Sequence, residues 1–406
     1  MQAVMKVFDA HEESNDQCLD PSDDAMTRCA ITGHHFLSSG FRSSSIHTPF
    51  HQLSLRRQVL ILLLCMCHLS CHKECSIVGP TDTWHFHGGI IYSFFDGAAG
   101  RGSWISVINP SEASPAPHFY LPKAIEPRVS PDGKSLLFSR IAGPAADLFV
   151  SNLDGTGEID ISQTDTLSES WADWSPDGQK FVCTARTWPG LKDAIRVMNK
   201  DGSGAHNISD SLHVATYSTP RWSPAGGKIA FIGQDTYGGQ RWLGVVSEDG
   251  TGLVRYGSVG TYAPVWSPNG RKIAYAGVNY LPQVLDLSSG LTTLLGVGPL
   301  AESSGYAWLL DGRLLYASQA DSGYEISVVA WMPALIRTTV VSKLPRGIAI
   351  VTSFDSEQIA FIGRESSSVL SLYTVGMDGS GLRRVATVDS SGTAVVAQDG
   401  YIQWTK

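Results

Sequence analysis

Two histidines, His85 and His87, are the first residues whose types and spacing could do chemistry. They lie two apart in an expected strand, so both imidazoles point to one side and could share a metal ion. No third ligand accompanies them, and the histidines after residue 71 do not recur at a fixed spacing. The simpler interpretation is a polar face on a strand. The sequence therefore predicts neither a metal site nor a cofactor.

Motifs of the common catalytic sites are missing from the sequence. The nearest approach to a Gly-x-Ser-x-Gly nucleophile elbow is Gly257-Ser258-Val259-Gly260, which has the wrong spacing. There is no His-Glu-x-x-His motif and no phosphate-binding loop. The chain has 30 Lys and Arg against 38 Asp and Glu, with no basic run, which argues against nucleic acid as a partner. These observations favour a binding protein over an enzyme.

Three short segments combine an aromatic residue with glycine or proline. They are Trp188-Pro189-Gly190, Tyr237-Gly238-Gly239 and Tyr280-Leu281-Pro282. Loops that present aromatic side chains are common at protein–protein interfaces. We expect Trp188, Tyr237 and Tyr280 to form a binding rim, and the alternative is ordinary packing of loops.

The elements that must position these loops come from a repeat of about 45 residues. Its copies centre on a Ser-Pro-Asp-Gly turn, and the first four prolines step by 45, 48 and 44 residues. The repeat singles out Pro131, Asp132, Gly133, Trp174, Pro176, Asp177, Gly178, Trp222, Pro224, Trp266, Pro268, Asn269, Gly270, Trp308, Asp311 and Gly312. A second motif, Asp-Gly-Ser/Thr-Gly, recurs out of phase from Asp154, Asp201, Asp249 and Asp378. A period of this length with β character predicts the blades of a β-propeller.

Each copy of the repeat carries the chemistry of one turn and four strands. Serine at the first position, proline at the second and glycine at the fourth favour a type I turn between an inner strand and the next strand. That next strand is apolar, as in Lys228–Phe231, and a third follows, as in Leu243–Val245. Asp-Gly then predicts a hairpin to a fourth, outer strand.

Two positions of the repeat have expected structural roles. Asn269 and Ala225 stand where other copies have aspartate, which suits a turn residue and not a ring of metal ligands. The tryptophan before Ser-Pro is predicted to be a wedge between blades, because a large aromatic buries about 150–250 Å² against its neighbours.

The sequence predicts an all-β fold, a propeller of four-stranded blades over residues 84–406. Paired second and third strands can be counted seven times, and six or eight blades remain alternatives. The tail offers Ala394–Val396 and Tyr401–Trp404, half a repeat. We expect this tail to complete the N-terminal blade, which closes the ring and removes exposed sheet edges.

The repeat resembles the WD40-like PD40 repeat of TolB-type β-propellers over about residues 88–404. TolB is a periplasmic protein of the Tol–Pal envelope system, with an α/β domain before its propeller. The resemblance implies a similar propeller and raises the prospect of Pal-like binding. Because the repeat begins soon after Cys75, we expect that α/β domain and TolA binding to be missing. The same repeat also precedes the hydrolase domain of prolyl oligopeptidase-type enzymes. Because the last expected strand ends just before Lys406, we expect no such domain after the propeller.

The N-terminal region has the features of a targeting sequence. Residues 1–58 are polar without a sustained period, which predicts a disordered extension. We hypothesise that the natural start lies downstream of Met1. Residues 56–71 resemble a signal peptide: Arg56-Arg57 precedes a short apolar stretch, too short to span a bilayer. His68-Leu69-Ser70-Cys71 resembles a bacterial lipobox, with Cys71 the candidate lipid attachment site. Simple cleavage and an uncleaved anchor are the alternatives.

These features predict an exported, monomeric propeller of the periplasm, outer membrane or cell surface. The leading hypothesis is a non-catalytic protein that binds an envelope protein or peptide through loops on one rim, with a lipid anchor to the membrane. One alternative is an enzyme acting on carbohydrate or peptide at the central channel, which requires His, Asp or Arg side chains to converge there. A passive structural module of an envelope complex is the other alternative.

Overall fold

The computed structural model describes most of residues 89–405. The gaps are 97–101, 113–114, 143–144, 163, 165, 188–192, 210–215, 236–238, 261, 296–304, 321–322, 332–334, 345, 354, 366–368, 390–394 and 397–401. The chain divides into two units, Met1–Ser76 and Ile77–Lys406, and every described residue belongs to the second. Predictions for the extension, Arg56, Arg57, Cys71, His85 and His87 therefore fall outside the described residues.

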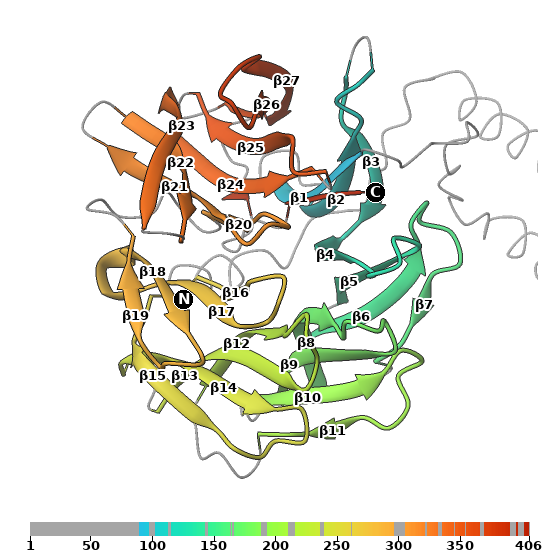
Figure 1. Ribbon diagram of the computed structural model, residues 1–406. Coiled ribbons are helices and arrows are strands. Elements are labelled where there is room, and N and C mark those ends of the chain that lie inside the picture. The colour runs from blue at the N-terminus through green and yellow to red at the C-terminus, as the bar shows by residue number, and fades with distance from the viewer. Residues whose placement is uncertain are drawn as a thin grey trace, which may run out of the picture. The chain divides into compact units, whose positions relative to one another are not determined.

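The strands form seven antiparallel sheets, which are the blades of a ring (Figure 1). Blade 1 contains β1 (Ile90–Asp96), β2 (Gly102–Ile108), β3 (His118–Pro122), β28 (Val395–Val396) and β29 (Ile402–Trp404). Blade 2 contains β4 (Ala124–Val129), β5 (Ser135–Ala142), β6 (Ala145–Asn152) and β7 (Ile159–Asp160). Blade 3 contains β8 (Leu167–Trp174), β9 (Lys180–Thr187), β10 (Asp193–Asn199) and β11 (His206–Asn207). Blade 4 contains β12 (Thr216–Trp222), β13 (Lys228–Gln234), β14 (Arg241–Ser247) and β15 (Val254–Ser258).

The remaining three blades repeat this order. Blade 5 contains β16 (Val265–Trp266), β17 (Lys272–Ala276), the 3₁₀ turn η1 (Val278–Tyr280), β18 (Pro282–Asp286) and β19 (Thr292–Leu294). Blade 6 contains β20 (Tyr306–Trp308), β21 (Leu314–Ala320), β22 (Gly323–Ala330) and β23 (Ile336–Leu344). Blade 7 contains β24 (Arg346–Thr352), β25 (Gln358–Arg364), β26 (Leu370–Gly376) and β27 (Arg383–Asp389). The predicted seven-bladed propeller is confirmed, and within the described residues no helix has the length and hydrophobicity of a membrane span.

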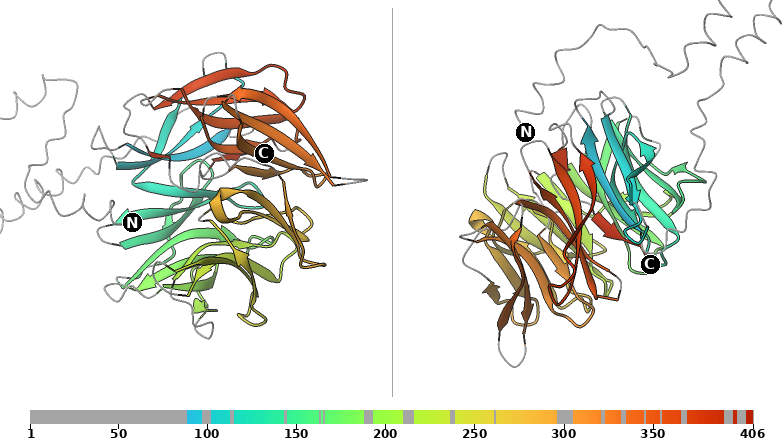
Figure 2. Two further views of the ribbon diagram at one scale, coloured as in Figure 1. Left: turned by 90° about the vertical axis from the view of Figure 1, so that its left-hand side faces the viewer. Right: turned by 90° about the horizontal axis from the view of Figure 1, so that it is seen from above.

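The ring is closed by the C-terminal strands, as the tail of the sequence predicts. Both β28 and β29 pair with β1, through Phe95↔Val395 and Ile91↔Gln403 among other partners. The tail therefore supplies one interrupted inner strand, and β1, β2 and β3 supply the rest of blade 1. Figure 2 shows this blade beside its neighbours from two further directions.

The Ser-Pro-Asp-Gly turns fold as their residue types predict. In the blade 3 copy the Gly178 N–H donates to the Ser175 carbonyl at 2.9 Å, which closes the turn. The Asp177 carboxylate accepts from the Ser175 hydroxyl at 2.6 Å and from the Gln179 N–H at 3.0 Å. Asn269 accepts the matching bonds from Ser267 and Arg271. The aspartate is thus a turn residue.

The predicted wedge role of tryptophan is also confirmed. Trp174, Trp222 and Trp266 are buried at the ends of the inner strands β8, β12 and β16. The indole N–H of Trp174 donates to the Arg128 carbonyl of the preceding blade at 3.0 Å. Trp266 repeats this bond to the Arg221 carbonyl, also at 3.0 Å. Trp174 and Trp266 therefore join two inner strands by packing and by a hydrogen bond.

The hydrophobic core lies between adjacent blades. Between blades 4 and 5, for example, Leu243 and Val245 pack in one buried cluster with Trp266 and Ile273. Cys183 is fully buried in β9. Because both sides of each sheet are covered by neighbours, binding surfaces must come from the strand ends.

The strand order gives the ring two unlike faces. One carries the turns between first and second strands and the hairpins between third and fourth strands, and we call it the turn face. The other carries the loops between second and third strands and the connections between blades, and we call it the loop face. The first strand of each blade lies nearest the ring axis (Figure 1). A site near the axis is therefore built from strands far apart in the sequence.

Candidate functional site

Tyr280 is the one residue of the predicted binding rim that the structure describes. It ends η1 on the loop face, and its side chain is 40% exposed. Trp188 and Tyr237 fall outside the described residues. The strands that flank them, β9 with β10 and β13 with β14, belong to the two blades preceding that of Tyr280.

The turn that carries Tyr280 is held in a strained backbone conformation. Asn279 and Tyr280 have φ of 62° and 60°, the left-handed region that costs a non-glycine residue about 1–3 kcal/mol. The Tyr280 N–H donates to the Gly277 carbonyl at 3.1 Å. The Tyr280 ring lies 5.0 Å from that of Tyr262, and a Cβ at Gly260 would come within 3.1 Å of it. The Tyr280 ring is therefore held in place and still partly exposed. Val278 beside it is also exposed.

A second aromatic group lies at the loop-face ends of β13 and β14. The guanidinium of Arg255 lies 4.2 Å from the ring centroid of Trp242 and pairs with Asp235 at 2.9 Å. The Trp242 indole donates to the same carboxylate at 3.2 Å. Arginine, tryptophan and tyrosine are enriched among the residues that dominate binding energy at protein interfaces. The Arg255 and Asp235 side chains are 41% and 57% exposed, so a partner can reach them.

Three charged residues occupy matching positions on adjacent inner strands, each one residue before the strand ends. They are Arg128 on β4, Asp173 on β8 and Arg221 on β12. Arg128 Nε lies 4.0 Å from one Asp173 oxygen, and the other accepts from the Trp222 N–H at 2.9 Å. Both carboxylate oxygens of Asp173 thus have partners.

No histidine joins this charged group among the residues the structure describes. His118 and His206 lie on β3 and β11, the last strands of their blades, and His213 falls outside the described residues. Nor does the described part of the chain contain three His, Cys, Asp or Glu side chains placed to hold a metal ion.

A neighbouring acid, Glu126, braces the inner strands. Its Oε2 accepts from the Trp171 N–H of the next blade at 2.6 Å and from the Ser139 hydroxyl at 3.1 Å. Glu126, Trp171 and Thr219 occupy matching bulges of β4, β8 and β12, with φ of 61°, 53° and 51°. These bulges let each inner strand bond to the next, so the carboxylate of Glu126 is committed to the fold.

A cavity of about 410 Å³ opens on the turn face. Its lining comes from blades 6, 7, 1 and 2, and we call it the turn-face cup. The lining residues are Val129, Ser130, Pro131, Gly133, Trp308, Leu310, Val351, Thr352, Ser353, Ser356, Gln403 and Trp404. Most of them end an inner strand or belong to the turn after it.

The cup lies where the repeat loses its tryptophan wedge. Val129 and Thr352 end β4 and β24, at the position that is tryptophan in β8, β12 and β16. The tryptophans on either side of Thr352, which are Trp308 and Trp404, are only partly buried. Leu310 replaces the turn proline and is 64% exposed at the lip. Smaller side chains at two wedge positions thus leave the space that an indole fills elsewhere.

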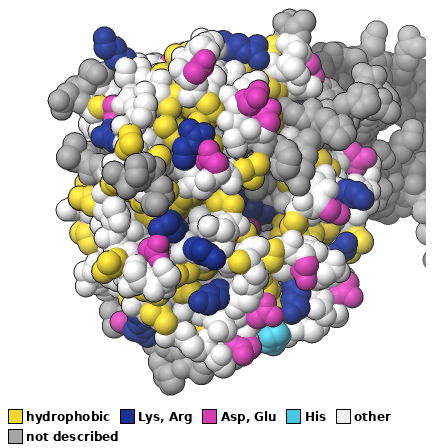
Figure 3. Space-filling view, in the orientation of Figure 1, with side chains coloured by type: hydrophobic (Ala, Val, Ile, Leu, Met, Phe, Trp, Pro, Cys, Tyr) yellow, Lys and Arg dark blue, Asp and Glu magenta, His cyan; other side chains and the backbone are white. Residues whose placement is uncertain are grey.

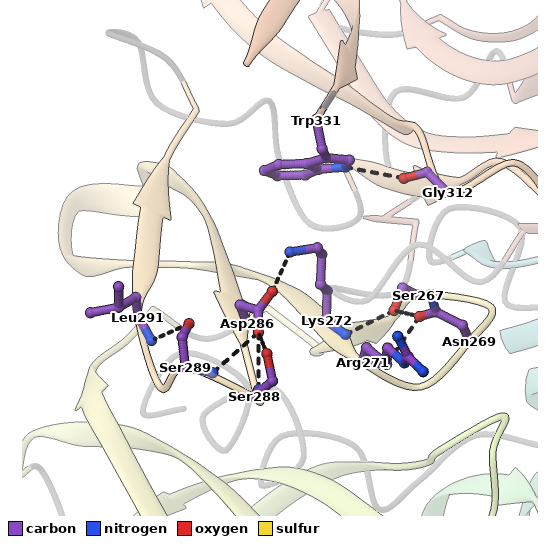
Figure 4. A network of polar contacts seen from close by, with 10 residues as sticks. All are labelled: Ser267, Asn269, Arg271, Lys272, Asp286, Ser288, Ser289, Leu291, Gly312 and Trp331. Atoms are coloured by element: carbon purple, nitrogen blue, oxygen red, sulfur yellow. Dashed lines mark hydrogen bonds and ion pairs between the residues drawn. The ribbon is translucent and has the colours of Figure 1, made fainter. Parts of the chain in front are cut away.

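The wall of the cup at Trp308 is supported from behind by Trp331, whose hydrogen bond to Gly312 is drawn in Figure 4. Trp308 stacks on Trp331, with ring centroids 6.1 Å apart, and donates to the Val265 carbonyl at 3.0 Å. Trp331 donates to the Gly312 carbonyl at 3.1 Å, and the Lys272 ammonium lies 5.2 Å from its ring. Lys272 also bonds Asp286 at 2.5 Å, which holds the pKa of that carboxyl well below its usual range. The wall is therefore rigid.

Charge is mixed over the surface of the ring. Figure 3 shows Lys and Arg interspersed with Asp and Glu on the face in view. The cup differs from its surroundings, because none of the described residues that line it is ionisable. The cup was missed by sequence reasoning, and the signal that could have found it is the loss of tryptophan at 129 and 352.

No protein-family model and no curated protein matches the chain. Solved structures do match its fold. TolB from Acinetobacter baumannii is 15% identical, with a TM-score of 0.50 over 78% of this chain and 66% of that one. The match thus spans just under two thirds of the TolB chain. An oligogalacturonate lyase in complex with manganese is 13% identical, with a TM-score of 0.53 over 74% and 86%.

A third propeller, from the Trilobed protease of Pyrococcus furiosus, is 12% identical, with a TM-score of 0.50 over 73% and 93%. Its topology is described as an open velcro, whereas here β29 pairs with β1. Identities this low establish the fold alone. The propeller fold that the resemblance to TolB-type propellers implies is confirmed: the chain forms seven four-stranded blades.

Proposed function

We propose that the chain is an exported, non-catalytic propeller that binds a protein or peptide of the cell envelope through its loop face. The observation that carries this proposal is the Val278–Tyr280 turn. It keeps an aromatic side chain partly exposed at the cost of two left-handed residues. Strain of this kind persists where function selects it over stability. In the preceding blade, the exposed Arg255 and Asp235 side chains, which contact the buried Trp242, add a charged part to this surface.

The proposed location rests on the N-terminal residues and on the fold. Arg56-Arg57, the apolar stretch after them and Cys71 support export and lipid attachment. A propeller fold shared with TolB supports an envelope setting. With the anchor at the membrane, the partner is an envelope protein or peptide.

The test is site-specific photo-crosslinking in cells of the source organism. A photoreactive phenylalanine analogue replaces Tyr280 in the full chain, and Ser289 is the matched control. Ser289 lies in the same blade, exposed on the turn face, between β18 and β19. We expect one dominant crosslinked envelope protein from position 280 and none of it from position 289. Equal crosslinking from both positions, or none from 280, contradicts the proposal.

The second candidate function is an enzyme acting on carbohydrate or peptide near the ring axis. The observation in its favour is the placement of Arg128, Asp173 and Arg221 at matching positions on adjacent inner strands, with Arg128 Nε 4.0 Å from Asp173. Saturable cleavage of envelope glycan or peptide by the purified chain, lost in Asp173→Asn, would replace the binding proposal. A passive structural module, the third alternative, shows no affinity for any isolated partner.

A further inference from the structure

We infer that the turn-face cup is a binding site for an uncharged sugar ring, separate from the proposed protein-binding loop face. Its volume of about 410 Å³ falls in the range of small-molecule sites. A rigid tryptophan wall, apolar neighbours and a few polar groups are the usual lining of such sites. The inference does not depend on the loop-face proposal, because the two surfaces lie at opposite ends of the strands.

Some polar groups that line the cup already take part in hydrogen bonds within the protein, and others are available to a ligand. Ser130 and Ser353 donate to the aspartates of their own turns and accept backbone N–H groups. Gln403 Oε1 accepts from the Val129 N–H at 2.7 Å, which leaves its amide N–H groups available. The hydroxyls of Thr352 and Ser356 form no hydrogen bond within the described part of the chain. Available donors and acceptors therefore stand beside indole and aliphatic surface.

This combination selects a ligand that is apolar on its faces and polar at its edges. A purely apolar side chain would bury the Gln403 amide and two hydroxyls without partners, which is unfavourable. A pyranose ring presents C–H groups to the tryptophan and aliphatic surface and hydroxyls to the amide and hydroxyl groups. It therefore fits both parts of the lining.

The charges around the cup favour an uncharged sugar over an acidic one. The lining described here offers no cation to balance a buried carboxylate or phosphate, and burying an unpaired charge is costly. In the three turns that form the lip, the exposed acids outnumber the exposed bases: Asp132, Asp311, Asp355 and Glu357 against Lys134 and Arg313. The Ser353 hydroxyl lowers the pKa of Asp355, so this group stays ionised and repels anions. Uronic acids and sugar phosphates are thus disfavoured.

The first test is calorimetric titration of the full chain with disaccharides. The neutral probes are N,N′-diacetylchitobiose, maltose and galactobiose, and digalacturonate is the acidic comparator. N-acetyltryptophanamide probes the alternative occupant, an apolar peptide side chain. We expect saturable binding of at least one neutral disaccharide at concentrations up to about 10 mM, and none of digalacturonate. Absence of binding by all three neutral probes overturns the inference, as does binding of N-acetyltryptophanamide alone.

Two variants assign the binding to the cup. Thr352→Trp restores the wedge of the other blades and should abolish sugar binding with no loss of thermal stability. Gln403→Glu keeps the acceptor for the Val129 N–H but removes the donor, and should weaken binding by about tenfold. The matched control, Asp177→Asn, copies the asparagine that the blade 5 turn already has and should bind as the wild type does. Sugar binding that survives Thr352→Trp and Gln403→Glu unchanged places the site elsewhere and refutes the assignment.

Discussion

The turn face and the loop face of this ring are formed by the same blades, but the turn face repeats one structure and the loop face does not. On the turn face, serine, aspartate and glycine form the same hydrogen bonds in copy after copy, and asparagine substitutes with no change of geometry. On the loop face the η1 turn of blade 5 places Asn279 and Tyr280 in a left-handed conformation that the described residues show in no other second-to-third-strand loop. The comparison teaches that the repeat builds the scaffold, and that candidate sites lie where it is broken.

The turn face itself contains both regular and altered copies of the repeat. The cup forms where Val129 and Thr352 replace the wedge and where Leu310 replaces the turn proline. Copies that keep the tryptophan and the turn proline, such as those of blades 3 and 5, bury their tryptophan. Substitutions in a regular copy and in an altered copy should therefore differ in their effects on stability and binding.

The largest effect is expected from removing a regular wedge. Trp266→Ala deletes a buried indole and its bond to the Arg221 carbonyl, and should lower the free energy of unfolding by about 3–5 kcal/mol. Trp308→Ala should cost clearly less, because part of that indole is already in contact with solvent at the cup. Chemical denaturation of both variants measures the difference. Equal losses would mean that the altered copy is packed as tightly as the regular one.

A smaller loss is expected from a hairpin glycine of the turn face. Gly250 has φ of 83°, and a Cβ there would lie 2.4 Å from the Ile208 carbonyl oxygen of the preceding blade. Gly227 has φ of 70° with no atom within 4 Å of its Cβ position. Gly227→Ala should therefore cost about 1 kcal/mol from backbone strain alone, and Gly250→Ala should cost about 2 kcal/mol or more. Matching melting temperatures for the two variants would contradict this close approach between blades.

On the loop face, we expect one substitution to abolish partner binding with little change in the free energy of unfolding. Tyr280→Gly relieves a left-handed residue while losing the ring contact with Tyr262, so the free energy of unfolding should change by less than about 1 kcal/mol. Crosslinking or affinity for the envelope partner should be lost in the same variant. A large loss of stability would show that the turn serves the fold, and unchanged binding would show that its aromatic ring is not a contact.

The smallest effect is expected from a turn carboxylate. The Ser175 hydroxyl and the Gln179 N–H lower the pKa of Asp177. A lowered folded-state pKa contributes stability above the ordinary carboxyl pKa, and this stability is lost as the pH falls through the lowered value. Asp177→Asn should change stability at neutral pH by less than about 0.5 kcal/mol and make the decline in acid shallower. Identical acid profiles for wild type and variant would contradict this role.

Much of the fold could be predicted because its signals are local. Proline and glycine mark turns at a fixed spacing, and the wedge tryptophan precedes them, so blades, turns and ring closure follow from the sequence. The cup could not be predicted in this way. It joins residues from 129 to 404, and its shape depends on what is absent at two wedge positions. The rim was predicted only as a set of aromatic loops, because the left-handed backbone of Tyr280 has no local signature in a tyrosine.

The most direct test of the central claim is the affinity of the crosslinked envelope partner for variants on the two faces. The dissociation constant is measured for the wild type, Tyr280→Ala and Thr352→Trp in the full chain. We predict at least about a tenfold loss of affinity in Tyr280→Ala and none in Thr352→Trp. The reverse pattern, with affinity lost only when the cup is filled, would place the protein-binding surface on the turn face and contradict the account.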